Sequence, residues 1–224
     1  MIELCQQADG IIGSPYNIKA LAKKESASLL VVSDSHGRAE TFRAIVERFG
    51  ERCDALVFCG DGISDLCSLL EATKKNKKLA AAFPPVVAFA RGNGDYPEFP
   101  LGDDEIKVPL HQILKAAGMS VLATHGHAEG VYYGLSRLNQ TAIESQADVV
   151  FYGHTHVASR QEMDCTFFIN PGSCARPRGG QKPSFAIVQI PGNQERAETA
   201  FFSISLTLTD GYDFIPYAPP QAPW

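Results

Sequence analysis

Aspartate, asparagine and histidine side chains recur along this chain in five short groups, each placed directly after an apolar segment. The groups are D-S-H-G (34–37), G-D-G (60–62), G-N-G-D (92–95), T-H-G-H (124–127) and G-H-T-H (153–156). Five of the six histidines of the chain fall within them. Imidazole, carboxylate and amide oxygen together suit divalent ions such as Mn, Fe, Zn or Ni. The groups therefore predict a metal site.

The number of candidate ligands indicates two ions rather than one. The candidates are Asp34, His36, Asp61, Asn93, His125, His154 and His156. One tetrahedral ion takes about four protein ligands, and a catalytic ion usually keeps one position open. Seven ligands suit two ions that share a carboxylate, and Asp61 is the expected bridge because it stands alone between the D-x-H group and the later histidines. The cysteines form no C-x₂-C pair, which argues against a structural zinc ribbon.

The apolar segments before these groups have the pattern of buried strands. They cover residues 28–34, 54–61, 85–93, 120–125 and 148–154. Their runs of Val, Leu, Ala and Phe show little alternation, which is typical of strands buried on both faces. In open α/β sheets, ligands bind beyond the carboxyl ends of the strands. We therefore expect the five groups to meet at one edge of the fold.

The rest of the chain supplies helices first and antiparallel strands later. An amphipathic helix is predicted over residues 38–50, and a weaker apolar stripe runs over 132–147. Residues 160–170, 184–190 and 200–208 read as strands without helices between them, which favours antiparallel pairing. The combination predicts an α/β fold with mixed sheets covered by helices.

The chain is expected to form one domain with two flanking segments. Residues 28–208 carry the motifs and the predicted elements, so they form the expected domain. Residues 1–27 are an N-terminal extension in which we identify no chemistry, and residues 209–224 are a C-terminal tail that ends in a proline-rich stretch. Either segment could serve an interface, so a homo-oligomer is left open.

Composition excludes several classes of protein. The chain has 224 residues, of which 45% are hydrophobic, and this is enough apolar material for a packed core. A net charge of −5 gives no basic surface for general nucleic-acid binding. No apolar run reaches the roughly 18 residues of a membrane span. The N-terminus lacks the pattern of a signal peptide, so we expect a cytoplasmic protein without membrane or nucleic-acid partners.

The order D-x-H, G-D, G-N, T-H-G-H, G-H-T-H and N-P-G-S (170–173) resembles the calcineurin-like metallophosphoesterases, and within them the small YfcE-like phosphodiesterase branch. The resemblance covers about residues 28–208. It implies a four-layer α-β-β-α sandwich with two mixed β-sheets. It also implies one metal held by Asp34, His36, Asp61 and His156, and a second held by Asp61, Asn93, His125 and His154.

The implied activity is hydrolysis of a small phosphoester, most simply a phosphodiester, by a hydroxide that bridges two divalent ions. We expect Mn, with Fe, Zn or Ni as alternatives, and assign catalytic roles to Asp61, Asn93 and His127. The alternatives are a phosphomonoesterase and a non-catalytic metal-binding scaffold like the retromer subunit of the same branch. That lineage has replaced metal-site histidines, whereas here every ligand position is filled.

Several residues outside the predicted ligand set have more than one possible role. His127 is expected to contact substrate phosphate or to protonate the leaving group, and a purely site-shaping role is the alternative. Gly94 stands where other branches of the superfamily have a histidine. So small a residue is expected to open the pocket, which would suit a diester or an activated leaving group. Arg176 and Arg178 either reach substrate phosphate or lie on the surface. His111 has no motif around it and is expected to be a surface or core-edge histidine.

Overall fold

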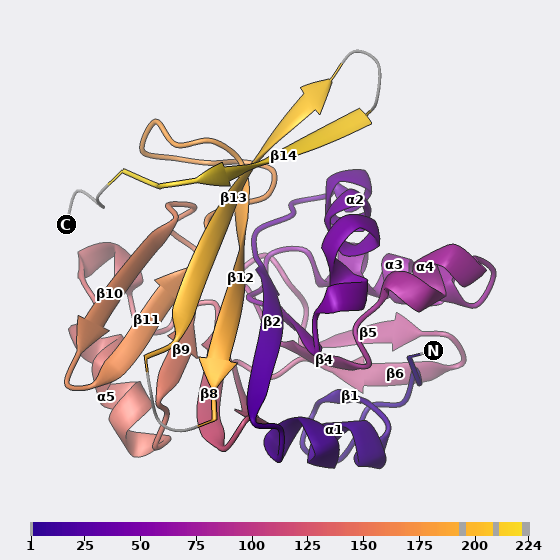
Figure 1. Ribbon diagram of the computed structural model, residues 1–224, viewed down its shortest axis with the longest axis horizontal. Helices are drawn as coiled ribbons and strands as arrows, with labels where there is room; N and C mark the ends of the chain where they lie inside the picture. The colour runs from indigo at the N-terminus through magenta and orange to yellow at the C-terminus, as the bar shows by residue number, and fades with distance from the viewer. Residues whose placement is uncertain (1, 193–195, 208–210, 221–224) are drawn as a thin grey trace.

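Two β-sheets stacked face to face form the centre of the computed structural model, which describes residues 2–192, 196–207 and 211–220 (Figure 1). The first sheet contains seven strands: β1 (Ile12–Gly13), β2 (Ser26–Val32), β3 (Ala55–Phe58), β4 (Val86–Phe89), β12 (Ser184–Pro191), β13 (Glu198–Thr207) and β14 (Gly211–Tyr217). Their order is β1-β4-β3-β2-β12-β13-β14. Strands β2, β3 and β4 are parallel, and the other pairings are antiparallel, so the sheet is mixed.

The second sheet contains five strands in the order β10-β11-β9-β8-β7. They are β7 (His111–Ala116), β8 (Met119–Thr124), β9 (Val149–Phe151), β10 (Ser159–Met163) and β11 (Thr166–Asn170). The three central strands, β8, β9 and β11, are parallel, and both edges pair antiparallel. A separate hairpin joins β5 (Glu98–Leu101) to β6 (Asp104–Lys107).

Helices cover the outer faces of the two sheets and one end of the sandwich. They are α1 (Pro15–Ala22), α2 (Ala39–Phe49), α3 (Ile63–Thr73), α4 (Lys77–Ala82) and α5 (Ser136–Glu144), with 3₁₀ turns η1 (Gly50–Arg52) and η2 (Val131–Tyr133). Helices α2, α3 and α4 pack on the seven-stranded sheet, and α5 packs on the other. The cluster between the sheets contains Leu29 and Val57 from one sheet and Val121 and Val149 from the other. The predicted four-layer sandwich is therefore confirmed.

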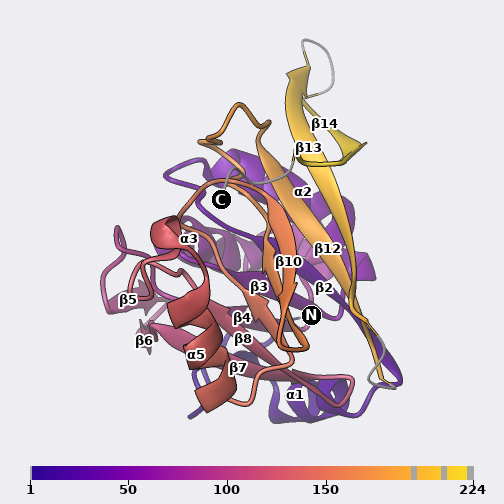
Figure 2. The same ribbon diagram turned by 90° about the vertical axis from the view of Figure 1, so that its left-hand side faces the viewer.

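Three segments differ from the sequence prediction. Residues 160–170 fold as the β10–β11 hairpin, because Asp164 and Cys165 adopt left-handed φ values of 48° and 66° and form a two-residue turn. Strand β14 lies inside the expected tail and pairs with β13, and the two extend beyond the body of the protein (Figures 1 and 2). Strand β1 lies inside the expected extension and pairs with β4.

The division at residues 27/28 and 208/209 stays a prediction, and residues 208–210 and 221–224 of the tail lie outside the described part. Helix α1 closes the end of the sandwich opposite the β13–β14 hairpin (Figure 2). Its Leu21 side chain joins the cluster between the sheets. Among the described residues, none of the helices combines the length and apolar character needed to cross a bilayer.

Candidate metal centre

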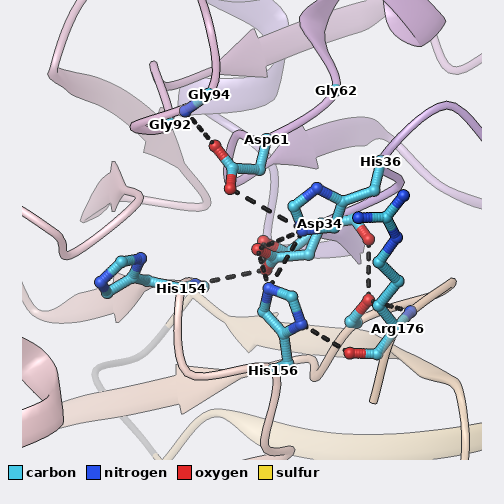
Figure 3. Close-up of polar contacts among 12 residues, drawn as sticks. Asp34, His36, Asp61, Gly62, Gly92, Gly94, His154, His156 and Arg176 are labelled. Carbon is cyan, nitrogen blue, oxygen red and sulfur yellow. Dashed lines mark hydrogen bonds and ion pairs between the residues drawn. The ribbon is translucent and has the colours of Figure 1, made fainter. Parts of the chain in front are cut away.

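The carboxyl ends of five parallel strands bring the five polar groups to one edge of the sandwich. The first three groups follow β2, β3 and β4 of one sheet, and the last two follow β8 and β9 of the other. Four donor residues lie within 4.8 Å of one another there: Asp34, His36, Asp61 and His156. Figure 3 shows their side chains pointing toward a common centre.

The first half of the centre is built around Asp34. Its Oδ1 atom lies 3.1 Å from His156 Nε2 and 3.7 Å from His36 Nε2. The two imidazoles approach each other with Nε2 atoms 3.0 Å apart. Asp61 Oδ2 lies 3.8 Å from His36 Nε2, so four possible ligand atoms from the ends of β2 and β3 and from the G-H-T-H loop face one small volume.

The second half lies on the other side of Asp61. Asp61 Oδ2 is 3.6 Å from His125 Nε2, and its Oδ1 accepts a 2.7 Å hydrogen bond from the Gly94 amide. His125 Nε2 lies 3.2 Å from Asn93 Oδ1 and 3.2 Å from His154 Nδ1. All seven predicted ligands are thus brought together, with Asp61 Oδ2 between the two halves.

Backbone carbonyls fix the orientation of two of the imidazoles. His125 Nδ1 donates to the Cys59 carbonyl at 2.7 Å, and His156 Nδ1 donates to the Arg176 carbonyl at 2.5 Å. Because a carbonyl only accepts, each Nδ1 carries the proton and each Nε2 lone pair is free when the ring is neutral. Asp34 Oδ1 is buried without a hydrogen-bond donor among the described residues. A divalent cation would satisfy these facing acceptors, so the residues fit one.

The ionisation of the side chains agrees with this fit. Burial would raise the pKa of Asp34, but the imidazoles of His156 and His125 lower it, so the carboxylate is charged. Burial, reinforced by the neighbouring His125, lowers the pKa of His154 to about 4. Burial also lowers the pKa of His36 despite the nearby Asp34. His154 and His36 are therefore neutral near pH 7 and have lone pairs available for an ion.

The backbone is left-handed at five of the predicted ligands. Their φ values are 55° at Asp34, 44° at His36, 55° at Asp61, 67° at His154 and 60° at His156. Residues with a Cβ adopt this region at a cost, and such conformations cluster at functional sites. Here they turn the chain sharply after each strand and aim the side chains back toward the centre.

Asp95 connects two of the loops that carry ligands. Its carboxylate accepts hydrogen bonds from the amides of Asp61 (2.7 Å), Gly62 (3.0 Å), Ile63 (3.0 Å) and Gly92 (2.9 Å). Gly92 must lack a side chain, because a Cβ there would overlap the Asp61 carboxylate and amide. The loops after β3 and β4 are therefore fixed relative to each other.

The N-P-G-S loop holds the D-x-H and G-H-T-H loops. Ser173 Oγ donates to the Asp34 carbonyl at 2.7 Å and accepts from the Arg176 amide at 2.7 Å. Asn170 Nδ2 donates to the Gly153 carbonyl at 2.9 Å. These buried contacts give the loop a structural role in shaping the centre.

His127 lies beside the second half without belonging to it. Its ring centroid is 5.4 Å from that of His125 and 6.1 Å from that of His154. Its Nδ1 is buried without a hydrogen-bond partner in the described part of the chain. Burial, together with the neighbouring His125, lowers the pKa of His127, so its ring is neutral near pH 7.

Several residues near the centre make contacts that the sequence does not predict. His111 pairs with the buried Glu129, whose Oε1 lies 2.6 Å from His111 Nε2. Tyr132 contacts His154, and the Arg178 guanidinium lies over the Tyr132 ring. None of these residues stands in a metal-ligand pattern, and their contacts join segments distant in sequence, so only the folded structure identifies them.

Comparison with known proteins identifies the family. Residues 28–193 match the calcineurin-like phosphoesterase superfamily domain. The chain belongs to this superfamily. Over 167 residues it is 30% identical to YsnB of Bacillus subtilis, a probable metallophosphoesterase, with 73% of this chain and 84% of YsnB covered. Over 172 residues it is 30% identical to the phosphodiesterase YfcE of Escherichia coli K12, with 71% of this chain and 86% of YfcE covered.

Solved structures show the same fold at lower identity. A predicted phosphoesterase from Streptococcus pneumoniae TIGR4 superposes with a TM-score of 0.61 and 22% identity, covering 87% of this chain and 99% of that one. Vacuolar Protein Sorting 29 from Cryptosporidium parvum superposes with a TM-score of 0.60 and 16% identity, covering 87% and 100%. At these sequence identities the structural likeness shows only that this chain shares the fold of those proteins.

Proposed function

We propose that this chain is a dinuclear metal-dependent phosphodiesterase that hydrolyses a small phosphoester. The observation that carries the proposal is the convergence of six possible ligand residues on the two sides of the Asp61 carboxylate. The first ion would be held by Asp34, His36, Asp61 and His156. The second would be held by Asp61, Asn93, His125 and His154. Mn²⁺ is the proposed metal, with Fe, Zn and Ni as alternatives.

Bound divalent ions supply an activated water and neutralise the phosphoryl oxygens of the substrate. The protein contributes the placement of the reacting groups. Asp61 separates and bridges the two halves, and Asn93 is held against His125 in the second half. His127 is proposed to donate an N–H to a phosphate oxygen. Its lowered pKa favours this role over protonation of the leaving group, which needs the charged ring.

A diester is the preferred substrate class because of Gly94. The superfamily branches with a histidine at this position have an imidazole there, whereas Gly94 has no side chain, and the three atoms nearest to a Cβ at this position would all belong to the Asp61 carboxylate, the first 3.2 Å away. The absence of a side chain at position 94 is our reason for proposing that a second ester group lies beside the second half. A monoester would leave this space unfilled.

Hydrolysis of a chromogenic phosphodiester with added Mn²⁺ tests the proposal. The wild type is expected to turn over the diester faster than the corresponding monoester, and Asp61→Ala is expected to lose turnover of both. Faster hydrolysis of the monoester would make the chain a phosphomonoesterase. Metal-loaded wild type that hydrolyses neither compound would contradict an enzymatic function.

The last outcome would favour a metal-binding scaffold, the alternative supported by the Vacuolar Protein Sorting 29 fold similarity. A scaffold has no need of an activated water, whereas this chain has donors at every predicted ligand position. The enzyme is therefore our first proposal. The cytoplasmic location, the absence of nucleic-acid partners and a homo-oligomeric state stay predictions.

A further inference from the structure

Tyr132 makes two contacts with one residue of the candidate metal centre. Its hydroxyl donates a 2.9 Å hydrogen bond to the backbone carbonyl of His154. Its ring packs edge-on against the His154 imidazole, with centroids 4.7 Å apart and an interplanar angle of 65°. Tyr132 therefore contacts both the main chain and the side chain of one proposed ligand, although it is 37% exposed.

His154 depends on such contacts more than His125 and His156 do. His125 and His156 are each anchored by a ring nitrogen that donates to a backbone carbonyl. Across the described residues, the His154 ring makes no bond of this kind, and its Nδ1 faces His125 instead. Its backbone is left-handed with φ 67°, a conformation that needs support from its surroundings. Tyr132 supplies that support through its hydrogen bond to the His154 carbonyl and its contact with the His154 ring.

Arg178 connects Tyr132 to the other end of the G-H-T-H loop. The Arg178 guanidinium carbon lies 5.8 Å from the Tyr132 ring centroid, in cation–π range. The Arg178 amide donates a 3.1 Å hydrogen bond to the His156 carbonyl. The Tyr132–Arg178 contact therefore spans the loop that carries both histidines, with one end on each.

We propose that Tyr132, held by Arg178, is a positioning residue that sets the affinity of the second metal ion through His154. The inference rests on the proposed dinuclear centre. Partners that orient a metal-binding imidazole typically change metal affinity about 10- to 100-fold when they are removed. The hydrogen bond and ring contacts that Tyr132 makes in the described part of the chain reach His154 and Arg178 and none of the four residues of the first half, so the first ion should bind unchanged.

Calorimetric titration of the full chain with Mn²⁺ tests the proposal without measuring turnover. Tyr132→Ala should weaken one of two binding classes by about 10- to 100-fold and leave the other unchanged. Tyr132→Phe, which keeps the ring contact and loses only the hydroxyl bond, should recover part of that affinity. Tyr133→Ala is the matched control, because Tyr133 is next to Tyr132 in the chain but its own side chain is 97% exposed. The affinity lost in Tyr132→Ala should be that of the class that survives in His36→Gln.

The outcomes separate this inference from the function on which it rests. Wild type that binds two ions, with Tyr132→Ala binding both as tightly, overturns the role of Tyr132 alone. Equal weakening of both classes, together with a lower melting temperature of the metal-free variant, also overturns it, because the residue is then generally structural. Wild type that binds fewer than two ions overturns the dinuclear centre and the inference together.

Discussion

Replacing the carboxylate between the two halves should remove most of the stabilisation that metal gives this protein. Asp61→Asn preserves the shape of the side chain, and its amide oxygen can still accept from the Gly94 amide, as Asp61 Oδ1 does at 2.7 Å. The amide NH₂ then occupies the position of Oδ2, which lies 3.8 Å from His36 Nε2 and 3.6 Å from His125 Nε2. The N–H groups at that position repel a cation on either side, so the binding of both ions should be weakened.

The size of the effect follows from the length of the chain. Unfolding entropy near the melting temperature is about 2.1 cal/mol/K per residue. For 224 residues it amounts to about 0.47 kcal/mol/K. An ion present at 100 times its dissociation constant stabilises the folded state by about 2.7 kcal/mol. One ion should therefore raise the melting temperature by about 6 °C, and two ions by about 11 °C.

Thermal unfolding with chelator and then with Mn²⁺ measures these shifts. The wild type should show the two-ion shift, His36→Gln about half of it because only the first half is damaged, and Asp61→Asn little or none. A wild-type shift in Asp61→Asn would refute the bridging position of this carboxylate. Complete loss of the shift in His36→Gln would refute two separable halves.

Three further changes test the structure around the centre. Asp95→Ala removes the acceptor of four backbone N–H groups and should lower the unfolding free energy of the metal-free protein by about 2–3 kcal/mol in urea; an unchanged midpoint would contradict this. His111→Gln should cost most stability between about pH 4.5 and 6.5. The hydrogen bond to Glu129 raises the pKa of His111, so its contribution is full below 6.5 and declines as pH rises through the folded value. Burial would raise the pKa of Glu129, but His111 lowers it, so that contribution is lost as pH falls below 4.5; a difference from wild type that grows above pH 7 in denaturation curves would argue against the pair. Gly92→Ala should displace Asp61 and abolish the Mn²⁺ shift in melting temperature, and a retained shift would disprove the close approach.

The strands that carry the centre could be predicted from the sequence, because burial on both faces requires a continuous run of apolar residues. Continuous apolar runs must be buried on both faces, so the segments ending near Asp34, Asp61 and His125 could be assigned as central strands. The turn between β10 and β11 was missed because Asp164 and Cys165 take left-handed conformations without a glycine. Sequence preference at a turn is weak when neighbouring strands impose the geometry.

The candidate centre also has a part that the sequence predicts and a part that it does not. Residue types and order were sufficient to propose the ligands, since metal chemistry restricts which side chains can serve. The supporting contacts were not foreseeable, because they depend on where distant loops meet. The His111–Glu129 pair joins a strand to a loop 18 residues later, and Tyr132 reaches His154 across 22 residues. Such polar contacts follow no periodic pattern.

The left-handed turns carry a consequence for how this protein can change over time. A histidine in that region is less stable than glycine by roughly 1–2 kcal/mol at each position, whereas aspartate tolerates it better. The chain has three such histidines, with φ values of 44° at His36, 67° at His154 and 60° at His156. If a relative no longer bound metal, substitution of these histidines by glycine would stabilise its fold, and selection for metal binding would not remove the substitutions. The residues at positions 36, 154 and 156 should therefore distinguish relatives that still bind metal from those that keep only the scaffold.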